Sequence, residues 1–286
     1  MSAPSLTYNQ TIHGICDFIE VAIHTILYVR QIYPADLFIR RKKYDTPVFQ
    51  SRHPALNEYI SGAIKAVAEQ LRTGNLEKVV VVIKNREQVA LERFIFAVEN
   101  MIQIEAYDKG QTVEDALDAS ALGHYFRGFL VKLNMIEATL GQMYLDEDVS
   151  FGITIELKPE TVPTTTSKNQ PPWIPAFTQH TTAGTSDESQ LHLIRAVNTG
   201  IINMSLAVQE TEEKLQRERE ARERLLLSLK KPPAPSTEAE HEPTPTPPVS
   251  SILAADVLGA NLADDFVRSV HEPQEDFEEA EGEPDS

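Results

Sequence analysis

The feature that most constrains the fold is an apolar stripe of helical period in residues 113–144. Apolar side chains recur there at steps of three and four residues, which is the spacing of one helix face. They are Leu122, Phe126, Phe129, Leu130, Leu133, Ile136, Leu140 and Met143. A length of about nine helical turns follows. A helix this long cannot cover its own stripe, so we predict that it is the central helix of one domain and that the flanking segments pack on it.

Acidic residues lie at the start of this predicted helix and a glycine lies near its end. Glu114, Asp115 and Asp118 fall in the first turns, where the helix dipole favours negative charge. Gly141 marks the exit. The side opposite the stripe is polar and carries Arg127.

Charge is distributed unevenly along the chain. The 286 residues contain 43 Asp or Glu against 26 Lys or Arg, a net charge of −17. Residues 232–286 contain 14 of these acids against one Arg and no Lys, which leaves 29 acids against 25 bases, a net charge of −4, in residues 1–231. The acidic character therefore belongs to the tail and excludes no partner of the folded part.

Cysteine content and hydropathy indicate the compartment. Cys16 is the only cysteine, which excludes an internal disulfide and a zinc site of the thiolate type, so we expect a reducing environment. The first residues show no basic region followed by an apolar run, so we expect no secretory signal. Polar and charged residues interrupt the apolar segment 12–33, so we expect a soluble intracellular protein without a membrane span.

Two further helices are predicted before the first strand. Residues 11–33 have apolar side chains over more than half of the helix circumference, which indicates a core helix ended by Pro34. His53 and Pro54 open a second helix, and Gly74 closes it.

The loop predicted between these helices contains a basic run. Arg40, Arg41, Lys42 and Lys43 are followed by Tyr44. Such a run beside an aromatic residue can follow a phosphate backbone, but it is more often a solvated loop. We favour the solvated loop and expect no direct nucleic-acid binding.

Three strands are predicted around the central helix. Residues 76–84 contain a β-branched run that indicates a buried strand. Residues 89–98 return in alternation, so we predict a hairpin. Residues 151–157 alternate between apolar and polar side chains and predict a third strand after the central helix.

An irregular segment, residues 159–188, follows the third strand. It is rich in Thr, Pro, Ser and Gln, and it contains the only tryptophan, Trp173. This side chain either packs against the sheet or contacts a ligand, and the sequence leaves both readings open. Apolar residues return in residues 191–208.

The C-terminal part changes character twice. Residues 210–230 show a charged helix pattern. Residues 232–248 contain seven prolines, which predict an extended linker. An apolar island at 252–270 is either a docking helix for a partner or residual helicity in a disordered tail.

No arrangement of residues indicates an active site. The eight histidines are scattered, and no metal-binding pair, phosphate-binding glycine loop or nucleophile elbow occurs. Cys16 lies on an apolar helix without an adjacent base, which indicates an inert thiol. We therefore predict no catalytic residue, no metal, no cofactor and no enzyme activity.

The order of these elements, and short segments within them, resembles the HORMA-domain family. The segments are FIEVA at 18–22, ILYVR at 26–30, YP at 33–34, RKKY at 41–44, PV at 47–48, HP at 53–54, LN at 56–57, YI at 59–60, EKVVVVI at 77–83 and PWI at 172–174. Within the family, residues 11–100 are most similar to the branch that serves translesion DNA polymerase zeta as a noncatalytic accessory subunit. The resemblance is looser over 101–208 and absent from 209 onward.

The resemblance implies an α+β HORMA fold, with three helices packed on an antiparallel sheet. A C-terminal safety belt, residues 159–208, closes over an extended partner peptide within a domain of residues 8–208. A charged helix at 209–231 and a Pro-rich, acidic, disordered tail at 232–286 follow. The length of irregular chain in the belt agrees with this reading.

The resemblance also implies partners and contact residues. Tyr59 and Trp173 match family aromatics that line a peptide of the polymerase zeta catalytic subunit. Arg127 matches the arginine of an interface with a second HORMA protein or a second copy of this chain. Leu191 matches a contact with a scaffolding translesion polymerase, and the nucleus is the expected location.

Two positions on that last surface depart from the family. Ser205 and Ala207 stand where relatives have a glutamine and a tyrosine. Either the scaffold contact differs in this protein or the alignment slips in the looser region. The implied function is an adaptor in translesion synthesis, and the alternative is a HORMA regulator of a cell-cycle checkpoint or a meiotic chromosome axis.

Overall fold

The computed structural model describes most of the first 230 residues. The described residues are 4–101, 109–113, 116–141, 143, 149–163 and 173–230. Residues 1–232 form one compact unit. The predicted Pro-rich linker, apolar island and acidic tail lie outside the described residues.

Helix α1 (Tyr8–Val29) is the core helix that the sequence predicts, displaced toward the N-terminus. It starts three residues early because Thr7 and Gln10 form a reciprocal capping box. It ends at Val29, before Pro34, because the chain turns at Gln31, whose φ is 53°. The helix is long and apolar enough to cross a membrane, but 61% of its most apolar window is buried in the protein. It therefore forms the centre of a packed core.

A two-stranded ribbon replaces the predicted basic loop. Strands β1 (Phe38–Lys43) and β2 (Thr46–Ser51) pair in antiparallel fashion after the short 3-10 helix η1 (Ala35–Leu37). The loop interpretation was wrong because residues 40–43 are all exposed, so no apolar alternation marks the strand.

Helix α2 (Pro54–Thr73) follows the predicted start and stop signals. The His53 side chain accepts a hydrogen bond from the Leu56 amide at the start. Gly74 ends the helix with a φ of 74°, a conformation that glycine adopts without strain. The Tyr8 hydroxyl donates to the Leu71 carbonyl at 2.8 Å and joins α1 to the end of α2.

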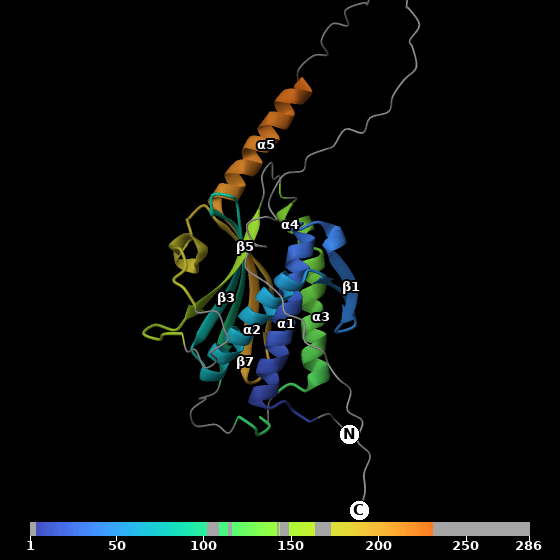
Figure 1. Cartoon of the computed structure of the whole chain (residues 1–286), viewed down its shortest axis with the longest axis vertical. Helices are drawn as coiled ribbons and strands as arrows, with labels where there is room; N and C mark the ends of the chain where they lie inside the picture. Colours follow the sequence, from blue (N-terminus) through green and yellow to red (C-terminus); the bar gives the residue numbers. More distant parts are fainter. Residues whose placement is uncertain are drawn as a thin grey trace, which may run out of the picture. The chain divides into compact units, whose positions relative to one another are not determined.

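The main sheet has five antiparallel strands in the order β5-β3-β4-β7-β6. They are β3 (Leu76–Lys84), β4 (Ala90–Asn100), β5 (Ser150–Leu157), β6 (Gln190–Asn198) and β7 (Ile202–Glu210). Helices α1 and α2, with α3 (Ala119–Asn134), lie on one face of this sheet (Figure 1). The predicted α+β fold with three helices on an antiparallel sheet is confirmed.

The core lies between the helices and this face of the sheet, which we name the helix face. Phe18 of α1 stacks on Phe126 of α3 with ring centroids 4.5 Å apart, and its edge meets Phe96 of β4. Each of these rings is almost fully buried, which contributes about 1.5–3 kcal/mol per side chain. The opposite side, the back face, has a smaller apolar cluster of Val80, Val82, Ala90 and Ile95.

The central helix is shorter than predicted. It starts at Ala119 because the Asp118 side chain caps the Ala121 amide, and it stops at Asn134, where Met135 leaves helical geometry. A separate short helix, α4 (Glu137–Leu140), continues the apolar stripe, and Gly141 follows with a φ of 70°. The stripe is buried from Leu122 to Leu140, and Met143 is half-buried. Glu114 and Asp115 lie outside the described residues.

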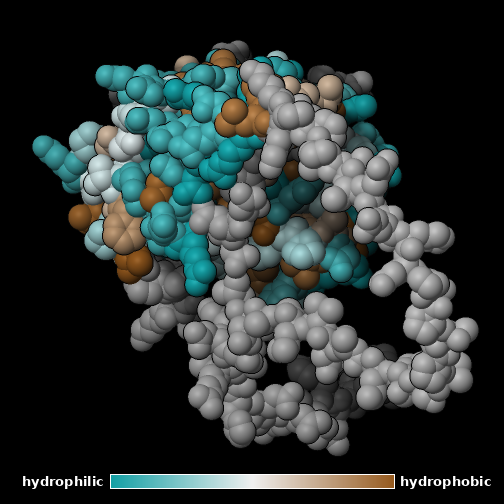
Figure 2. Space-filling view, turned by 90° about the horizontal axis from the view of Figure 1, so that it is seen from above, coloured by the Kyte–Doolittle hydropathy of each residue, from teal (hydrophilic) through white to brown (hydrophobic). Residues whose placement is uncertain are grey.

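Helix α5 (Glu212–Lys230) follows β7 directly and agrees with the predicted charged helix. Figure 2 shows the end of the molecule from which α5 leaves the sheet, and the visible surface is mainly hydrophilic with interspersed hydrophobic side chains. Two 3-10 helices, η3 (Thr178–His180) and η4 (Thr182–Gly184), interrupt the irregular segment before β6.

Candidate partner-binding site

The outer edge of β5 is open. Strand β5 pairs only with β3 among the described strands, so one side of its backbone has no ladder partner there. The Ile153 amide donates to the Tyr59 hydroxyl at 3.2 Å instead of to β3, so it points toward the open edge. Because alternate residues of an antiparallel strand bond to the same side, the amides of Phe151 and Ile155 face this edge too. The edge is therefore able to pair with an added strand.

Tyr59 stands beside this edge on α2. Its ring is 46% exposed and meets Phe151 of β5 edge-on, with centroids 5.7 Å apart. Phe151 in turn meets Tyr33 edge-on at 6.3 Å. Burial raises the pKa of Tyr33, so its phenol stays neutral at physiological pH. Three aromatic rings thus line the helix face of the open edge.

The segment of residues 159–208, which we name the belt, reaches both faces of the sheet. Trp173 is half-buried and packs against the core cluster of the helix face. Further along the belt, Thr181 and Thr182 contact side chains of the back face. Among the open alternatives for Trp173, the structure shows packing, and its contact with a ligand stays a prediction.

Glu156 fastens the belt on the back face. Its carboxylate accepts from the amide of Thr182 at 2.5 Å and from the hydroxyl of Thr182 at 2.7 Å. Lys78 on β3 donates to the same carboxylate at 2.9 Å. Burial acts to raise the pKa of Glu156, but the hydrogen bonds from Thr182 and Lys78 outweigh burial and lower it. Glu156 is therefore ionised at neutral pH and holds the belt.

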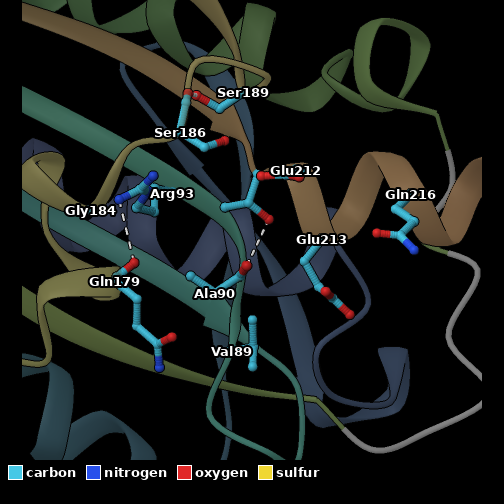
Figure 3. A pocket seen from close by; sticks show the side chains of 11 residues that line it. Val89, Ala90, Arg93, Gln179, Gly184, Ser186, Ser189, Glu212, Glu213 and Gln216 are labelled. Carbon is cyan, nitrogen blue, oxygen red and sulfur yellow. Dashed lines mark hydrogen bonds between the residues drawn. The ribbon is translucent and has the colours of Figure 1, made fainter.

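Arg93 of β4 is a second anchor on the back face. Its side chain is 1% exposed, and its guanidinium donates to the carbonyls of Gln179 and Thr181 and to the hydroxyl of Thr185. Figure 3 shows the Arg93 side chain directed to this part of the belt. We name the anchoring contacts of Glu156 and Arg93 the back-face clasp. Neither residue was predicted from the sequence, although Glu156 occupies a polar position of the clearest alternating strand.

The end of the belt is held by buried charges on the helix face. Glu92 is fully buried and accepts two hydrogen bonds from Arg30, at 2.7 and 2.9 Å. Lys214, in the first turn of α5, lies 2.7 Å from the same carboxylate and also pairs with Glu210 at the end of β7. Arg30 and Lys214 also donate to the carbonyls of Gly141 and Leu140. This charge cluster joins α1, β4, β7, α4 and α5.

Burial and pairing oppose each other in this cluster. Burial alone would lower the pKa of Lys214, but the carboxylates of Glu92 and Glu210 raise it above its ordinary value. Lys214 is therefore charged at neutral pH. No sequence pattern indicated this cluster, because its members lie far apart in the chain and resemble surface residues of helices and strands.

Arg127 lies on the exposed side of α3, as the polar pattern predicts. Val131, one helical turn further along α3, is exposed too. The position is accessible, and its role in an interface between HORMA domains stays a prediction.

Leu191, Ser205 and Ala207 come together on the back face of β6 and β7. The register sets Leu191 opposite Gln209, and it sets Leu193 opposite Ala207. Leu191 is 63% exposed, while Ser205 and Ala207 are half-buried. The three predicted contact residues thus share one surface, and their role in binding a scaffold polymerase stays a prediction.

The described residues offer little material for catalysis. Nowhere in them do three His, Cys, Asp or Glu side chains gather in a way that could hold a metal ion. Burial raises the pKa of Cys16 to about 12, so this thiol is protonated and unreactive at neutral pH. What the geometry supports is the binding of a chain along the β5 edge.

These features define a class of protein: an α+β domain with three helices on one sheet face, an open edge strand and a C-terminal belt that reaches both faces. The chain belongs to the HORMA-domain family. The family model named HORMA domain matches residues 13–121.

Relatives extend the similarity well beyond that match. The chain is 32% identical over 221 residues to "Mitotic spindle assembly checkpoint protein MAD2B" of Danio rerio, which covers 75% of this chain and 98% of the relative. It is 30% identical over 228 residues to the protein of the same name from Homo sapiens, with the same coverage. It is 36% identical over 145 residues to "DNA polymerase zeta processivity subunit" of Schizosaccharomyces pombe, covering 50% of this chain and 66% of the relative.

Solved structures share the fold at lower identity. A chain of "Crystal Structure of Mitotic Checkpoint Complex" superposes with a TM-score of 0.56 at 18% identity, over 70% of this chain and 98% of that chain. "Structure of C. elegans HTP-1 bound to HIM-3 closure motif" also has a TM-score of 0.56, at 15% identity, over 71% of this chain and 91% of that chain. These similarities support the fold.

Proposed function

We propose that this protein is a noncatalytic adaptor that traps a peptide of the polymerase zeta catalytic subunit and joins it to other translesion factors. The observation that carries the proposal is the open edge of β5, flanked by Tyr59 and followed directly by a belt that contacts both sheet faces. A peptide added to this edge gains main-chain hydrogen bonds, and the belt slows its release. Relatives named as polymerase zeta processivity subunits support the choice of partner.

Tyr59 has two states in this proposal. Without a peptide its hydroxyl covers the Ile153 amide, which would otherwise lack a protein partner. A bound strand takes over that amide and leaves the exposed ring of Tyr59 free to pack on the peptide. In this proposal Trp173 of the belt also contacts the bound peptide.

A second candidate is a HORMA regulator in mitosis or on meiotic chromosomes. It is favoured by relatives whose names place them in the spindle assembly checkpoint and by the fold shared with HTP-1 bound to a closure motif. The mode of binding is the same in both candidates, and only the trapped peptide differs.

Affinity purification from cells of the source organism after DNA damage, followed by crosslinking mass spectrometry, distinguishes the two candidate functions. The adaptor proposal expects a B-family polymerase subunit crosslinked to β5 or the belt. Recovery of checkpoint or chromosome-axis proteins alone would favour the second candidate. An interaction surface restricted to α3 would contradict peptide trapping in both.

A further inference from the structure

The belt contains an exposed threonine followed by acidic residues. Residues 185–188 read Thr-Ser-Asp-Glu, and Thr185 is exposed, as are Asp187 and Glu188. Carboxylates two and three positions after a hydroxyl form a charge pattern that suits a protein kinase with a basic substrate groove. The hydroxyl of the neighbouring Ser186 is buried, so Thr185 is the accessible member of the pair.

This threonine contacts Arg93, which lines a polar cavity. A cavity of about 330 Å³ lies under the belt at the end of the sheet, and its lining includes Arg93, Gly184 and Ser186. Arg93 donates to the Thr185 hydroxyl at 3.3 Å, and the Arg93 Nε atom is buried without a hydrogen-bond partner among the described residues. A buried, incompletely satisfied guanidinium favours an anion placed within reach.

We propose that Thr185 is a phosphorylation site and that Arg93 binds the resulting phosphate, which fastens the belt to the back face. In the modification, the Thr185 hydroxyl oxygen bonds to the γ-phosphorus of ATP as the bond from that phosphorus to the β–γ bridging oxygen breaks. ADP leaves, and the hydroxyl proton passes to the catalytic carboxylate of the kinase. The phosphate then receives charge-assisted hydrogen bonds from Arg93.

Whether a phosphate on Thr185 tightens or loosens the belt depends on its distances from the surrounding charges. Glu212 and Glu213 also line the cavity and repel a phosphate. Figure 3 shows the Glu213 side chain directed away from Arg93, whereas Thr185 already contacts the guanidinium. Attraction at hydrogen-bond distance therefore exceeds repulsion across the cavity.

Gly184 makes this arrangement possible. A Cβ atom at position 184 would lie 2.3 Å from the Thr178 carbonyl oxygen, so the turn closes only with glycine. The turn places Thr185 over the sheet, next to Arg93. The site is thus built by the local sequence as well as by the sheet.

The inference rests on the proposed peptide trapping only for its functional consequence, so the test has a readout without peptide. The native full chain is treated with ATP and an acid-directed Ser/Thr kinase, and phosphate is mapped by mass spectrometry. Full-length protein with phosphothreonine encoded at position 185 is then compared with unmodified protein and with phosphothreonine at Thr178, an exposed residue of the same belt. Amide hydrogen exchange of residues 178–189 is measured in each.

We expect phosphate at Thr185, and amide exchange in 178–189 about tenfold slower only in the protein phosphorylated at 185. Arg93→Gln should abolish this slowing, and the 31P signal of phosphothreonine 185 should lose its shift from that of a phosphothreonine peptide. An unmodified Thr185, unchanged exchange, or faster exchange would overturn the inference. Failure to trap any peptide, with slowed exchange intact, would contradict the proposed function alone.

Discussion

The two ends of the belt are held by different kinds of interaction. At its C-terminal end, where β7 leads into α5, Glu92, Arg30 and Lys214 form a buried charge cluster in which each side chain is at most 5% exposed. At its N-terminal end, the belt follows β5 beside the open strand edge, where Tyr59 is 46% exposed. Buried charges thus fix the C-terminal end of the belt, whereas its N-terminal end borders an unpaired strand edge that can bind a partner.

This difference indicates which end moves when a peptide enters. Removing one member of a buried charge cluster leaves the others without a counter-charge, which makes opening at α5 costly. Opening beside β5 breaks the packing of Trp173 and the hydrogen bonds that Glu156 and Arg93 make with the belt, but it breaks no buried ion pair of the described residues. We infer that the belt opens beside β5 while β7 and α5 stay in place.

The largest loss of stability is expected from a substitution in the charge cluster at the C-terminal end of the belt. Glu92→Gln takes from the buried Arg30 the carboxylate with which it pairs and takes one of its carboxylate partners from Lys214, so the free energy of unfolding should fall by about 3–5 kcal/mol. Urea denaturation measures it. The control is Glu220→Gln, whose exposed pair with Arg224 contributes at most about 0.5 kcal/mol. Equal losses in the two variants would remove the distinction between the belt ends.

A pH series measures core stability away from both belt ends. His24 is 5% exposed, and burial lowers its pKa from 6.5 to about 4. Because the unfolded chain binds the proton more tightly, stability should decline as pH falls from 6.5 to 4, by about 3 kcal/mol from this group. Urea denaturation at both pH values should show a smaller decline for His24→Gln. If the unsubstituted protein and His24→Gln lost the same stability over this pH range, His24 would not be the source of the pH dependence.

Substitution in the N-terminal part of the belt should weaken peptide binding more than it destabilises the fold. Trp173→Ala removes a half-buried aromatic of the belt, and a peptide of the polymerase zeta catalytic subunit should bind on the order of thirtyfold more weakly, or about 2 kcal/mol. Isothermal titration calorimetry measures the affinity, and circular dichroism checks the fold. An unchanged dissociation constant in a folded variant would remove Trp173 from the site.

The smallest effect separates the ring of Tyr59 from its hydroxyl. Tyr59→Ala should weaken the same peptide about fivefold, or about 1 kcal/mol, because it removes the ring. Tyr59→Phe keeps the ring and should stay within about twofold, since the peptide takes over the Ile153 amide that the hydroxyl covers. If Tyr59→Phe matched Tyr59→Ala, the hydroxyl would be the binding group.

Local patterns predicted the elements whose residues face one core. Strand β3 matches its predicted range, and α2 starts and stops at the predicted signals, because periodicity and caps depend on neighbours in sequence. The ribbon of β1 and β2 was missed because its basic side chains face solvent on both sides. The central helix was overextended because the apolar stripe continues through the break at Met135 into α4.

The site was accessible to sequence reasoning only in part. The resemblance to HORMA proteins predicts Tyr59 and Trp173 as peptide contacts; the structure places Tyr59 at the open edge, and the contact of both residues with a peptide stays a prediction. Glu92 and Arg93 are adjacent in β4 and point to opposite faces, where each meets a distant segment of the chain. No local pattern reveals such contacts, since they depend on how the fold brings Arg30 and Lys214 to Glu92 on one face and Thr181 to Arg93 on the other.

The most direct measurement is residue-resolved amide hydrogen exchange by NMR, with and without a peptide of the polymerase zeta catalytic subunit. Strand addition at the open edge predicts new protection at Phe151, Ile153 and Ile155, the amides that point away from β3. Protection should also rise in residues 173–185 as the belt closes. Protection confined to β6 or α3, with the three β5 amides unchanged, would contradict peptide trapping at this edge.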